Sequence, residues 1–361
     1  MNFYREVFVR RKITIIGAGS WGTALAASLA RNGHDILLWA RNKDFCDALN
    51  KEHINKKYLP NHILPKNISA SNDMEKVCSK ADTIFLASPS IYLESAVNEM
   101  LKVKPFCNDD GNQSYPTIAV LTKGFIPDKN GEPLFIIDVL EKMLPDFYKN
   151  HLVYVAGPSH GEEVVCGKLT GLIAASKNPM SSIRCREVLK SGSLLVYSSL
   201  DVIGVQVCAA AKNVIAVAFG ILDAISDSSD TFGDNTSSLL LAAGLNEIQI
   251  IGRAMGATHP ETFTSISGVG DLDVTCRSRY GRNRRFGREI ITENVLSKFN
   301  NLDDLILNIN KIGYLPEGAV ACKYVNILAK KNNLRLPICT GLYKILNKEL
   351  EPLKFIENLL N

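Results

Sequence analysis

Short apolar runs alternate with helical hydrophobic patterns along the first 200 residues of the chain. Runs rich in β-branched residues and bounded by polar or glycine-containing segments are typical of buried strands. The strands predicted in this way cover residues 12–16, 36–39, 83–87, 117–121, 152–156, 172–175 and 194–197. Because strands that alternate with helices favour a parallel, doubly wound sheet, we predict an α/β fold with a Rossmann-like N-terminal half.

From about Asp201 the hydrophobic period becomes helical. We therefore expect a sheet domain over residues 1–200, with 1–11 as a leading extension, and a mostly α-helical domain over 201–361. The apolar stretch 202–222 contains Gln206, Lys212 and Asn213, which favours a buried helix over stable insertion into a membrane. The polar, Asn/Asp/Gly-rich segment 106–116 predicts a surface insertion that carries no chemistry.

The first predicted strand runs directly into the motif Gly17-Ala18-Gly19-Ser20-Trp21-Gly22, which opens a helix of small residues. A G-x-G-x-x-G motif in that position is typical of dinucleotide binding. Gly17 allows the tight turn, Gly19 lets backbone amides approach a diphosphate, and Gly22 lets the helix pack on the sheet. The N-terminal end of that helix would face the phosphates, so residues 1–200 are predicted to be a dinucleotide-binding domain.

Composition restricts the classes of function. The chain has 361 residues, 46% of them hydrophobic and 22% charged, which suits two globular domains. A net charge of +4 gives little reason to expect nucleic-acid or membrane binding by the whole surface. The nine cysteines are scattered and form no Cys-x-x-Cys pair, so we expect no disulfide framework, no metal site and a reducing cytoplasm.

Lys212 and Asn213 lie among small and β-branched apolar residues on the predicted buried helix. Burial disfavours an ammonium group and lowers the pKa of a lysine toward neutrality, which suits a general acid or base. Lys212 is therefore the candidate catalytic residue. The alternative is that its side chain reaches the surface or pairs with a carboxylate.

Six arginines occupy the twelve positions from Arg277 to Arg288, with no acidic residue among them. Such a cluster is a solvated face, a nucleic-acid patch or a phosphate pocket. The glycines of the preceding segment 267–271 favour the pocket, because they let the backbone approach a small ligand. Within the cluster, Arg282 and Asn283 can hold phosphate oxygens by directed hydrogen bonds.

Two further loops follow predicted strands, which is where ligands of open α/β sheets bind. One contains Lys123, whose ammonium would lie against a phosphate or a carbonyl oxygen, and the other spans 157–163. Taken alone, Lys123 is equally typical of an exposed lysine at a strand end.

Together these motifs resemble the NAD(P)-dependent glycerol-3-phosphate dehydrogenase family in order and approximate spacing, over nearly the whole chain. The matching segments are 17–26, Lys123-Gly124, Gly157-Pro158-Ser159, 212–216, Gly270-Asp271-Leu272 with Thr275-Cys276, and Arg282-Asn283-Arg284. The resemblance implies interconversion of dihydroxyacetone phosphate and sn-glycerol 3-phosphate with NAD(H) or NADP(H), for phospholipid synthesis. It also implies a homodimer.

The resemblance further implies roles for single residues, with Lys212 as the catalytic acid or base. The residues that it places at the cofactor are Gly17, Gly19, Ser20, Trp21, Gly22, Arg41, Lys123, Gly161, Arg282 and Glu317. Those that it places at the substrate are Lys123, Gly157, Ser159, Lys212, Asn213, Asp271, Thr275, Gly281, Arg282 and Asn283.

Some positions depart from the family pattern or bear on the choice of cofactor. His160 and Gly161 stand where the family commonly has Phe-Ala, and Gly281 replaces a serine. The second strand is followed by Arg41 instead of the acid that binds the ribose of NAD. Because a cationic Arg41 tolerates a 2′-phosphate, we predict that NADPH is accepted at least as well as NADH.

The sequence leaves two other hypotheses of function open. A related β-hydroxyacid or 6-phosphogluconate-type dehydrogenase would share the architecture and take a carboxylate substrate. A non-enzymatic, cofactor-sensing regulator would use the arginines on nucleic acid, although that task needs no buried lysine. A short-chain dehydrogenase is disfavoured because the chain has no Tyr-x-x-x-Lys.

Overall fold

The computed structural model describes residues 9–103, 106, 115–278 and 280–360. Most of the predicted leading extension and of the predicted insertion 106–116 therefore lies outside the described residues, as does Arg279.

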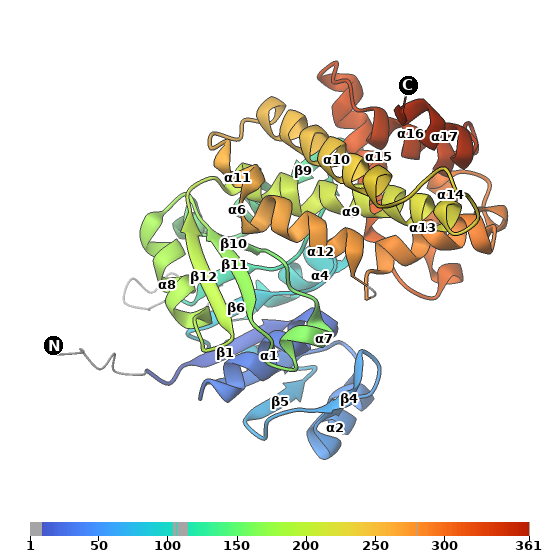
Figure 1. Ribbon diagram of the computed structural model, residues 1–361. Helices are drawn as coiled ribbons and strands as arrows, with labels where there is room; N and C mark the ends of the chain where they lie inside the picture. The colour runs from blue at the N-terminus through green and yellow to red at the C-terminus, as the bar shows by residue number, and fades with distance from the viewer. Residues whose placement is uncertain (1–8, 104–105, 107–114, 279, 361) are drawn as a thin grey trace, which may run out of the picture.

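A twisted sheet forms the first part of the chain, and helices cover both of its faces (Figure 1). Its strands are β1 (Lys12–Ile16), β2 (Asp35–Trp39), β5 (Ile68–Ser71), β6 (Thr83–Leu86), β7 (Thr117–Val120), β10 (Val153–Ala156), β11 (Thr170–Ala175) and β12 (Leu194–Ser199). They lie in the order β12-β11-β10-β7-β6-β1-β2-β5. Seven of these strands were predicted, whereas the polar edge strand β5 was not.

The elements that pack around this sheet include two hairpins that the hydrophobic pattern did not predict. The hairpins are β3 (Ile54–Asn55) with β4 (Leu59–Ile63), and β8 (Phe125–Pro127) with β9 (Pro133–Phe135). The helices are α1 (Ser20–Arg31), α2 (Lys43–Glu52), α3 (Met74–Cys78), α4 (Ser90–Met100), α6 (Ile136–Met143), η1 (Asp146–Tyr148), α7 (Gly161–Val164) and α8 (Pro179–Leu189).

Alternate residues of the central strands enter two separate hydrophobic clusters. Ile15 of β1 and Phe85 of β6 belong to one cluster, and Ile16 and Leu86, one position further along each strand, belong to the other. Because successive side chains point to opposite faces, both faces of the sheet are buried. This explains the continuous apolar runs from which the doubly wound sheet was predicted.

The sheet is not parallel throughout, so the prediction of a parallel sheet was wrong for one pair of strands. β10 pairs with β11 in antiparallel register, while the other neighbours pair in parallel. The connection from β10 to β11 contains only the one-turn helix α7, which lies at the carboxyl end of β10. A parallel return needs a longer crossover to the opposite edge, so the chain turns back beside β10.

The second part of the chain is helical and is built around one central helix (Figure 1). Its elements are α9 (Val202–Ser226), α10 (Asp234–Ala254), α11 (Glu261–Thr264), η2 (Ile266–Gly270), α12 (Asp271–Arg277), α13 (Arg282–Thr292), η3 (Val295–Lys298), α14 (Leu302–Leu307), η4 (Ile309–Ile312), α15 (Glu317–Lys331), α16 (Pro337–Leu346) and α17 (Pro352–Leu360). Within the described residues, only α9 is long and apolar enough to cross a membrane, and 94% of its apolar window is buried in the protein. The predicted buried helix is thus confirmed.

Glycines let neighbouring helices touch the backbone of α9. A Cβ atom on Gly287 of α13 would lie 2.0 Å from the Val217 carbonyl oxygen, and one on Gly318 of α15 would lie 2.3 Å from that of Asn213. Neither helix could come this close with a larger residue at the crossing. The side chains next to each crossing are thereby held at a set distance from α9.

We predict that Gly287→Ala lowers the free energy of unfolding by roughly 1–3 kcal/mol, because the added methyl group forces α13 away from α9. Urea unfolding measures the change. The matched control is Gly192→Ala, since a Cβ atom on Gly192 would meet no heavy atom within 4 Å in the part of the chain that the structure describes. Equal stability of the two variants would contradict the proposed contact.

Candidate functional site

The predicted site residues of the sheet domain lie on loops at one edge of the sheet. The glycine motif follows β1, Arg41 follows β2, Lys123 follows β7, and 157–161 follow β10. These four strands run parallel to one another, so their carboxyl ends share this edge. β1 is flanked by β2 on one side and β6 on the other, which makes it the switch point where ligands of such sheets bind.

The glycine loop is closely packed at two of its glycines and open at the third. Gly17 has φ +117°, and a Cβ atom there would lie 2.8 Å from the Ala87 carbonyl carbon. A Cβ atom on Gly22 would lie 2.1 Å from the Gly17 carbonyl oxygen, whereas one on Gly19 would meet no atom of the described residues within 4 Å. Gly17 and Gly22 therefore shape the loop, and Gly19 leaves room for a diphosphate.

The start of α1 fits an anionic group. Its N-cap is Gly19, which supplies no side-chain cap, and its first turn, with Ser20 and Trp21, contains no acidic residue. Its first amides are therefore left for a ligand. Gly161 lies against this turn, because a Cβ atom there would be 2.3 Å from Ser20 Oγ. These residues fit the diphosphate of a dinucleotide.

Arg41 is exposed at the same edge, and its Nη2 donates to Ser95 Oγ of α4 at 3.1 Å. Ser95 was not singled out from the sequence, since a serine on a helix carries no signal of such a contact. Nor was Glu162, whose Oε1 lies 3.5 Å from Ser20 Oγ.

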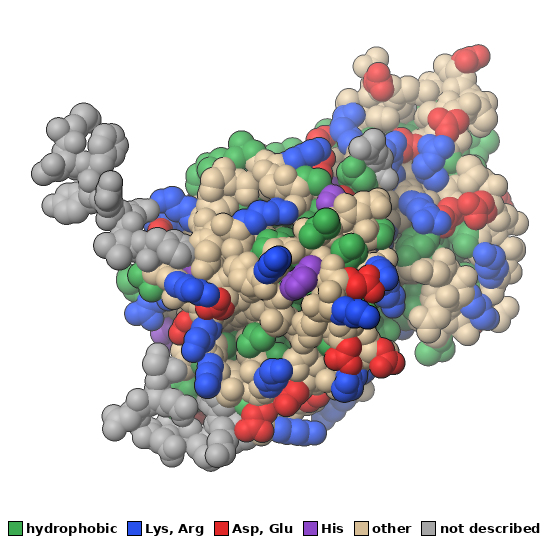
Figure 2. All heavy atoms as spheres, turned by 90° about the horizontal axis from the view of Figure 1, so that it is seen from below, with side chains coloured by type: hydrophobic (Ala, Val, Ile, Leu, Met, Phe, Trp, Pro, Cys, Tyr) green, Lys and Arg blue, Asp and Glu red, His purple; other side chains and the backbone are tan. Residues whose placement is uncertain are grey.

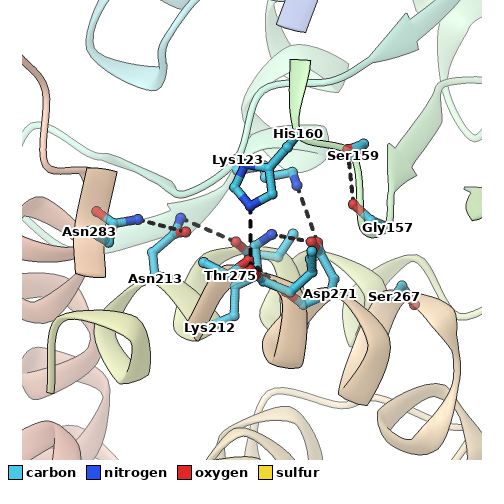
Figure 3. Close-up of polar contacts among 12 residues, drawn as sticks. Lys123, Gly157, Ser159, His160, Lys212, Asn213, Ser267, Asp271, Thr275 and Asn283 are labelled. Atoms are coloured by element: carbon cyan, nitrogen blue, oxygen red, sulfur yellow. Dashed lines mark hydrogen bonds and ion pairs between the residues drawn. The ribbon is translucent and has the colours of Figure 1, made fainter. Parts of the chain in front are cut away.

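The centre of the site is a buried cluster of two lysines and one carboxylate (Figure 3). Lys212 Nζ of α9 donates to Asp271 Oδ1 at the start of α12, and Lys123 Nζ donates to Asp271 Oδ2 at 3.2 Å. The exposed side-chain fractions are 5% for Lys212, 15% for Lys123 and 1% for Asp271. The carboxylate of Asp271 is thus shared between a lysine of the helical domain and a lysine from a loop of the sheet domain.

One carboxylate cannot neutralise two ammonium groups, and this sets the charge of the cluster. Burial, together with the neighbouring Lys123 charge, lowers the pKa of Lys212 to about 7 against the pull of Asp271. Burial also disfavours the Lys123 ammonium, but Asp271 outweighs it and raises the pKa of Lys123. Burial disfavours the Asp271 carboxylate as well, yet the two lysines hold the pKa of Asp271 below its ordinary value. Lys212 can therefore exchange a proton near neutral pH.

A chain of amide hydrogen bonds leads from this cluster to α13 and α15. Asn283 Nδ2 donates to Asn213 Oδ1 at 3.0 Å, and the Gly318 N–H donates to Asn283 Oδ1 at 2.9 Å. Both asparagines are buried, and Asn213 is adjacent in sequence to Lys212. Glu317, which precedes Gly318, begins α15 and raises the pKa of Lys123 by its charge. The predicted residues Asn213 and Asn283 are thus joined by a hydrogen bond beside Lys212, and Glu317 precedes the amide at which this chain of hydrogen bonds ends.

The loop after β10 forms another wall of the site. Gly157 has φ +145°, and a Cβ atom there would lie 2.5 Å from the Gly171 carbonyl oxygen. Ser159 Oγ donates to the Gly157 carbonyl at 2.9 Å, and His160 Nε2 lies 3.4 Å from the carbonyl oxygen of Val274. Burial and the nearby Lys212 lower the pKa of His160, so its ring is neutral at pH 7.

Two predicted residues belong to the ends of α12 and α13. Thr275 is buried one turn after Asp271 and donates its hydroxyl hydrogen to the Asp271 carbonyl. Gly281 is the N-cap of α13, where an added Cβ atom would lie 3.0 Å from the Thr275 carbonyl oxygen. In Figure 3, Lys123 and His160 extend from the sheet-domain loops toward Lys212, Asp271 and Thr275.

The arginine cluster is partly neutralised by acids from outside it. Carboxylates of Asp273, Asp223, Glu289 and Asp227 pair with Arg277, Arg284, Arg285 and Arg288 respectively. Arg282 differs from these four, because it is exposed at the first position of α13 and forms no ion pair within the described residues. Among the five arginines of the cluster that the structure describes, Arg282, beside Asn283, is therefore the candidate for the expected anion site.

Surface charges are mixed on the face of the molecule seen from below. Figure 2 shows Lys and Arg side chains interspersed with Asp and Glu over the described part of that face. A basic area of the kind that holds nucleic acid is not formed there. Nor do three or more His, Cys, Asp or Glu side chains converge as metal ligands in the described residues.

Comparison with known families covers both parts of the chain. Residues 12–182 match the model of the NAD-dependent glycerol-3-phosphate dehydrogenase N-terminus, and residues 201–357 match the model of its C-terminus.

Whole-length relatives agree with these matches. The chain is 78% identical over 349 residues to a glycerol-3-phosphate dehydrogenase [NAD(P)+] of Treponema denticola, covering 97% of this chain and 98% of the relative. It is 55% identical to that of Treponema pallidum (strain Nichols), with 96% and 99% covered. The crystal structure of glycerol-3-phosphate dehydrogenase from Coxiella burnetii superposes with a TM-score of 0.81 at 30% identity, with 98% and 99% covered.

We predict that inorganic phosphate binds beside Arg282. Arg282→Ala is expected to weaken that binding about tenfold or more, because a charge-assisted hydrogen bond contributes about 1.5–3 kcal/mol. Isothermal titration of the full chain with phosphate measures the change. Arg285→Ala is the control, since Arg285 is already paired with Glu289. Equal loss in both variants would show that phosphate responds only to net charge.

Proposed function

The chain belongs to the NAD-dependent glycerol-3-phosphate dehydrogenase family, and we propose that it reduces dihydroxyacetone phosphate to sn-glycerol 3-phosphate, and catalyses the reverse reaction, at the Lys123–Asp271–Lys212 cluster. The observation that carries this assignment of the site is the buried Lys212, whose Nζ shares the carboxylate of Asp271 with Lys123. A bound NAD(P)H supplies the hydride for the reduction.

Lys212 is the proton donor in the reduction. Its ammonium gives a proton to the carbonyl oxygen as that oxygen gains negative charge, and the neutral amine takes the proton back in the oxidation. A pKa near 7 lets Lys212 serve both directions at neutral pH. The nearby Lys123 keeps its proton and stabilises the developing charge on the oxygen.

Asp271 acts on the two lysines. Its two carboxylate oxygens accept from Lys212 and Lys123, so it holds both nitrogens on one side of the substrate. Because Asp271 is 1% exposed, these contacts are little screened by water.

Arg282 and Asn283 hold the phosphate of the substrate. Both lie in the first turn of α13, where unpaired backbone amides favour an anion. Asn283 also bonds to Asn213, the residue next to Lys212, so the phosphate and the reacting carbonyl are held in one frame. The remaining predicted contacts, Gly157, Ser159, Thr275 and Gly281, shape the wall around the substrate.

The wider biological setting belongs to the same proposal. We propose, as the resemblance implies, that the glycerol 3-phosphate formed by the reduction supplies phospholipid synthesis. A cytoplasmic location agrees with the free thiols of the cysteines that the structure describes, and cell fractionation tests it. The homodimer implied by the resemblance stays a prediction, which light scattering decides.

We predict rapid oxidation of NADPH at 340 nm with dihydroxyacetone phosphate and little with unphosphorylated dihydroxyacetone. NADH in a parallel assay is expected to give no higher kcat/KM than NADPH, because Arg41 is cationic.

Lys212→Ala should lose at least about 100-fold in kcat while it still binds the cofactor.

The control for this variant is Lys177→Ala, which removes an exposed lysine paired with Glu141. Near-normal turnover of Lys212→Ala would refute the assigned acid. No turnover in a wild-type preparation that binds the cofactor would refute the reaction.

We predict that kcat/KM for the reduction falls as the pH rises through about 7, since Lys212 then loses its proton. The oxidation should fall as the pH drops through the same range. Asp271→Asn removes the carboxylate that stabilises the Lys212 ammonium, so the pH dependence of both reactions should shift to lower pH. Lys123→Met removes a charge that repels this ammonium, so the pH dependence of both reactions should shift to higher pH. Shifts of equal sign would contradict this electrostatic origin, and the apparent pKa belongs to the cluster as a whole.

A further inference from the structure

A hairpin far from the lysines in sequence contacts the glycine loop directly. The β3–β4 hairpin begins after α2, and its residue Asn55 is fully buried. Leu59 of β4 packs in the same hydrophobic cluster as Ile15 of β1, so the hairpin is anchored to the sheet. Asn55 is thus held rigidly against the turn that follows β1.

Both the nitrogen and the oxygen of the Asn55 side-chain amide form hydrogen bonds. Its Nδ2 donates to the Ala18 carbonyl oxygen at 3.0 Å and to Thr23 Oγ1 at 2.8 Å. Its Oδ1 accepts from the Tyr58 N–H at 3.1 Å, inside the hairpin. The Thr23 hydroxyl in turn donates to the Ala18 carbonyl at 3.3 Å. Asn55 therefore links the hairpin, the glycine loop and α1.

The bond to Ala18 determines where the next amide points. In a planar trans peptide the C=O and the following N–H point in opposite directions. Because the Ala18 carbonyl points at Asn55, the Gly19 N–H points away from the hairpin. That N–H forms no backbone hydrogen bond within the described residues, and a Cβ atom on Gly19 would meet nothing within 4 Å.

We propose that Asn55 is a positioning residue for the dinucleotide, which fixes the Ala18–Gly19 peptide so that the Gly19 N–H meets the diphosphate. This inference rests on the proposed function, because it takes the cofactor to be a dinucleotide bound at α1. Asn55 itself does not touch the cofactor. Its effect is preorganisation of a donor that would otherwise have to be ordered on binding.

Asn67 provides a matched control at the opposite end of α1. Its Nδ2 donates to the carbonyl oxygens of Ala30 at 2.8 Å and His34 at 2.7 Å. Like Asn55, it ties α1 to a neighbouring segment through one amide group with two acceptors. A general loosening of α1 would therefore follow from either substitution, whereas a misplaced Gly19 amide would follow only from a change at Asn55.

The test uses the full chain with Asn55→Ala and Asn67→Ala. Titration with NADPH, followed by the fluorescence of the nicotinamide, gives Kd without turnover. We expect Asn55→Ala to raise Kd and KM for NADPH about tenfold, with kcat unchanged at saturation. Asn67→Ala should keep the wild-type Kd.

Two fragments of the cofactor locate the effect. ADP-ribose contains the diphosphate, and its inhibition constant should rise with Kd in Asn55→Ala. Adenosine 2′-monophosphate lacks the diphosphate, and its inhibition constant should not change. A wild-type Kd in Asn55→Ala, equal weakening of both fragments, or an equal effect of Asn67→Ala would overturn the inference.

A second variant covers the case in which Asn55→Ala does not fold. Asn55→Asp keeps an oxygen for the Tyr58 N–H and removes the Nδ2 donor to Ala18 and Thr23, so the same rise in Kd is expected. Failure of the proposed function gives a different result, because wild-type protein would then bind no dinucleotide or would bind it without reducing dihydroxyacetone phosphate.

Discussion

The arrangement depends on a buried charge imbalance, in which two ammonium groups share one carboxylate. Asp271 lies between Lys123 and Lys212 and can stabilise both only partly, so burial leaves Lys212 with a pKa of about 7. A solvent-exposed lysine would stay charged at neutral pH, and a buried lysine with a carboxylate of its own would be held charged by that carboxylate. The cluster also joins the two halves of the molecule, because Lys123 comes from a loop of the sheet and Lys212 from the core of the helical domain.

Helix α9 gives this cluster its geometry. Gly287 and Gly318 bring α13 and α15 into contact with the backbone of α9, which places Asn283 and the Gly318 amide within hydrogen-bond reach of one another. The proposed phosphate site at the start of α13 and the proposed proton donor on α9 are therefore parts of one packed unit. The proposed cofactor site is held differently, on loops at the carboxyl edge of the sheet, where Asn55 bonds to the Ala18 carbonyl and Gly17 packs against the backbone of Ala87.

Several features of the fold and the site could not be read from the sequence. The arginines from Arg277 to Arg288 look alike along the chain. Two of their partners lie far away in the sequence, Asp223 on α9 and Asp227 at the C-cap of that helix. Only the packing of α13 on α9 shows which arginine is left without a carboxylate in the described chain. The reversal of β11 was missed for a related reason, since an apolar run indicates a strand but carries no information about its direction. The strands β3, β8 and β9 were not predicted because two or three residues are too few for a hydrophobic period to be recognised.

What the sequence by itself determined was local: the buried strands, the glycine turn into α1, the long apolar helix and the presence of Lys212 within it. These follow from hydrophobic period and from the conformational freedom of glycine, which act over a few neighbouring residues. The tertiary structure alone decided that Lys212 meets Asp271 and Lys123, and that Asn55 meets Ala18. Such contacts join residues far apart in the chain, and the pKa of Lys212 depends on them because desolvation and charge act through space.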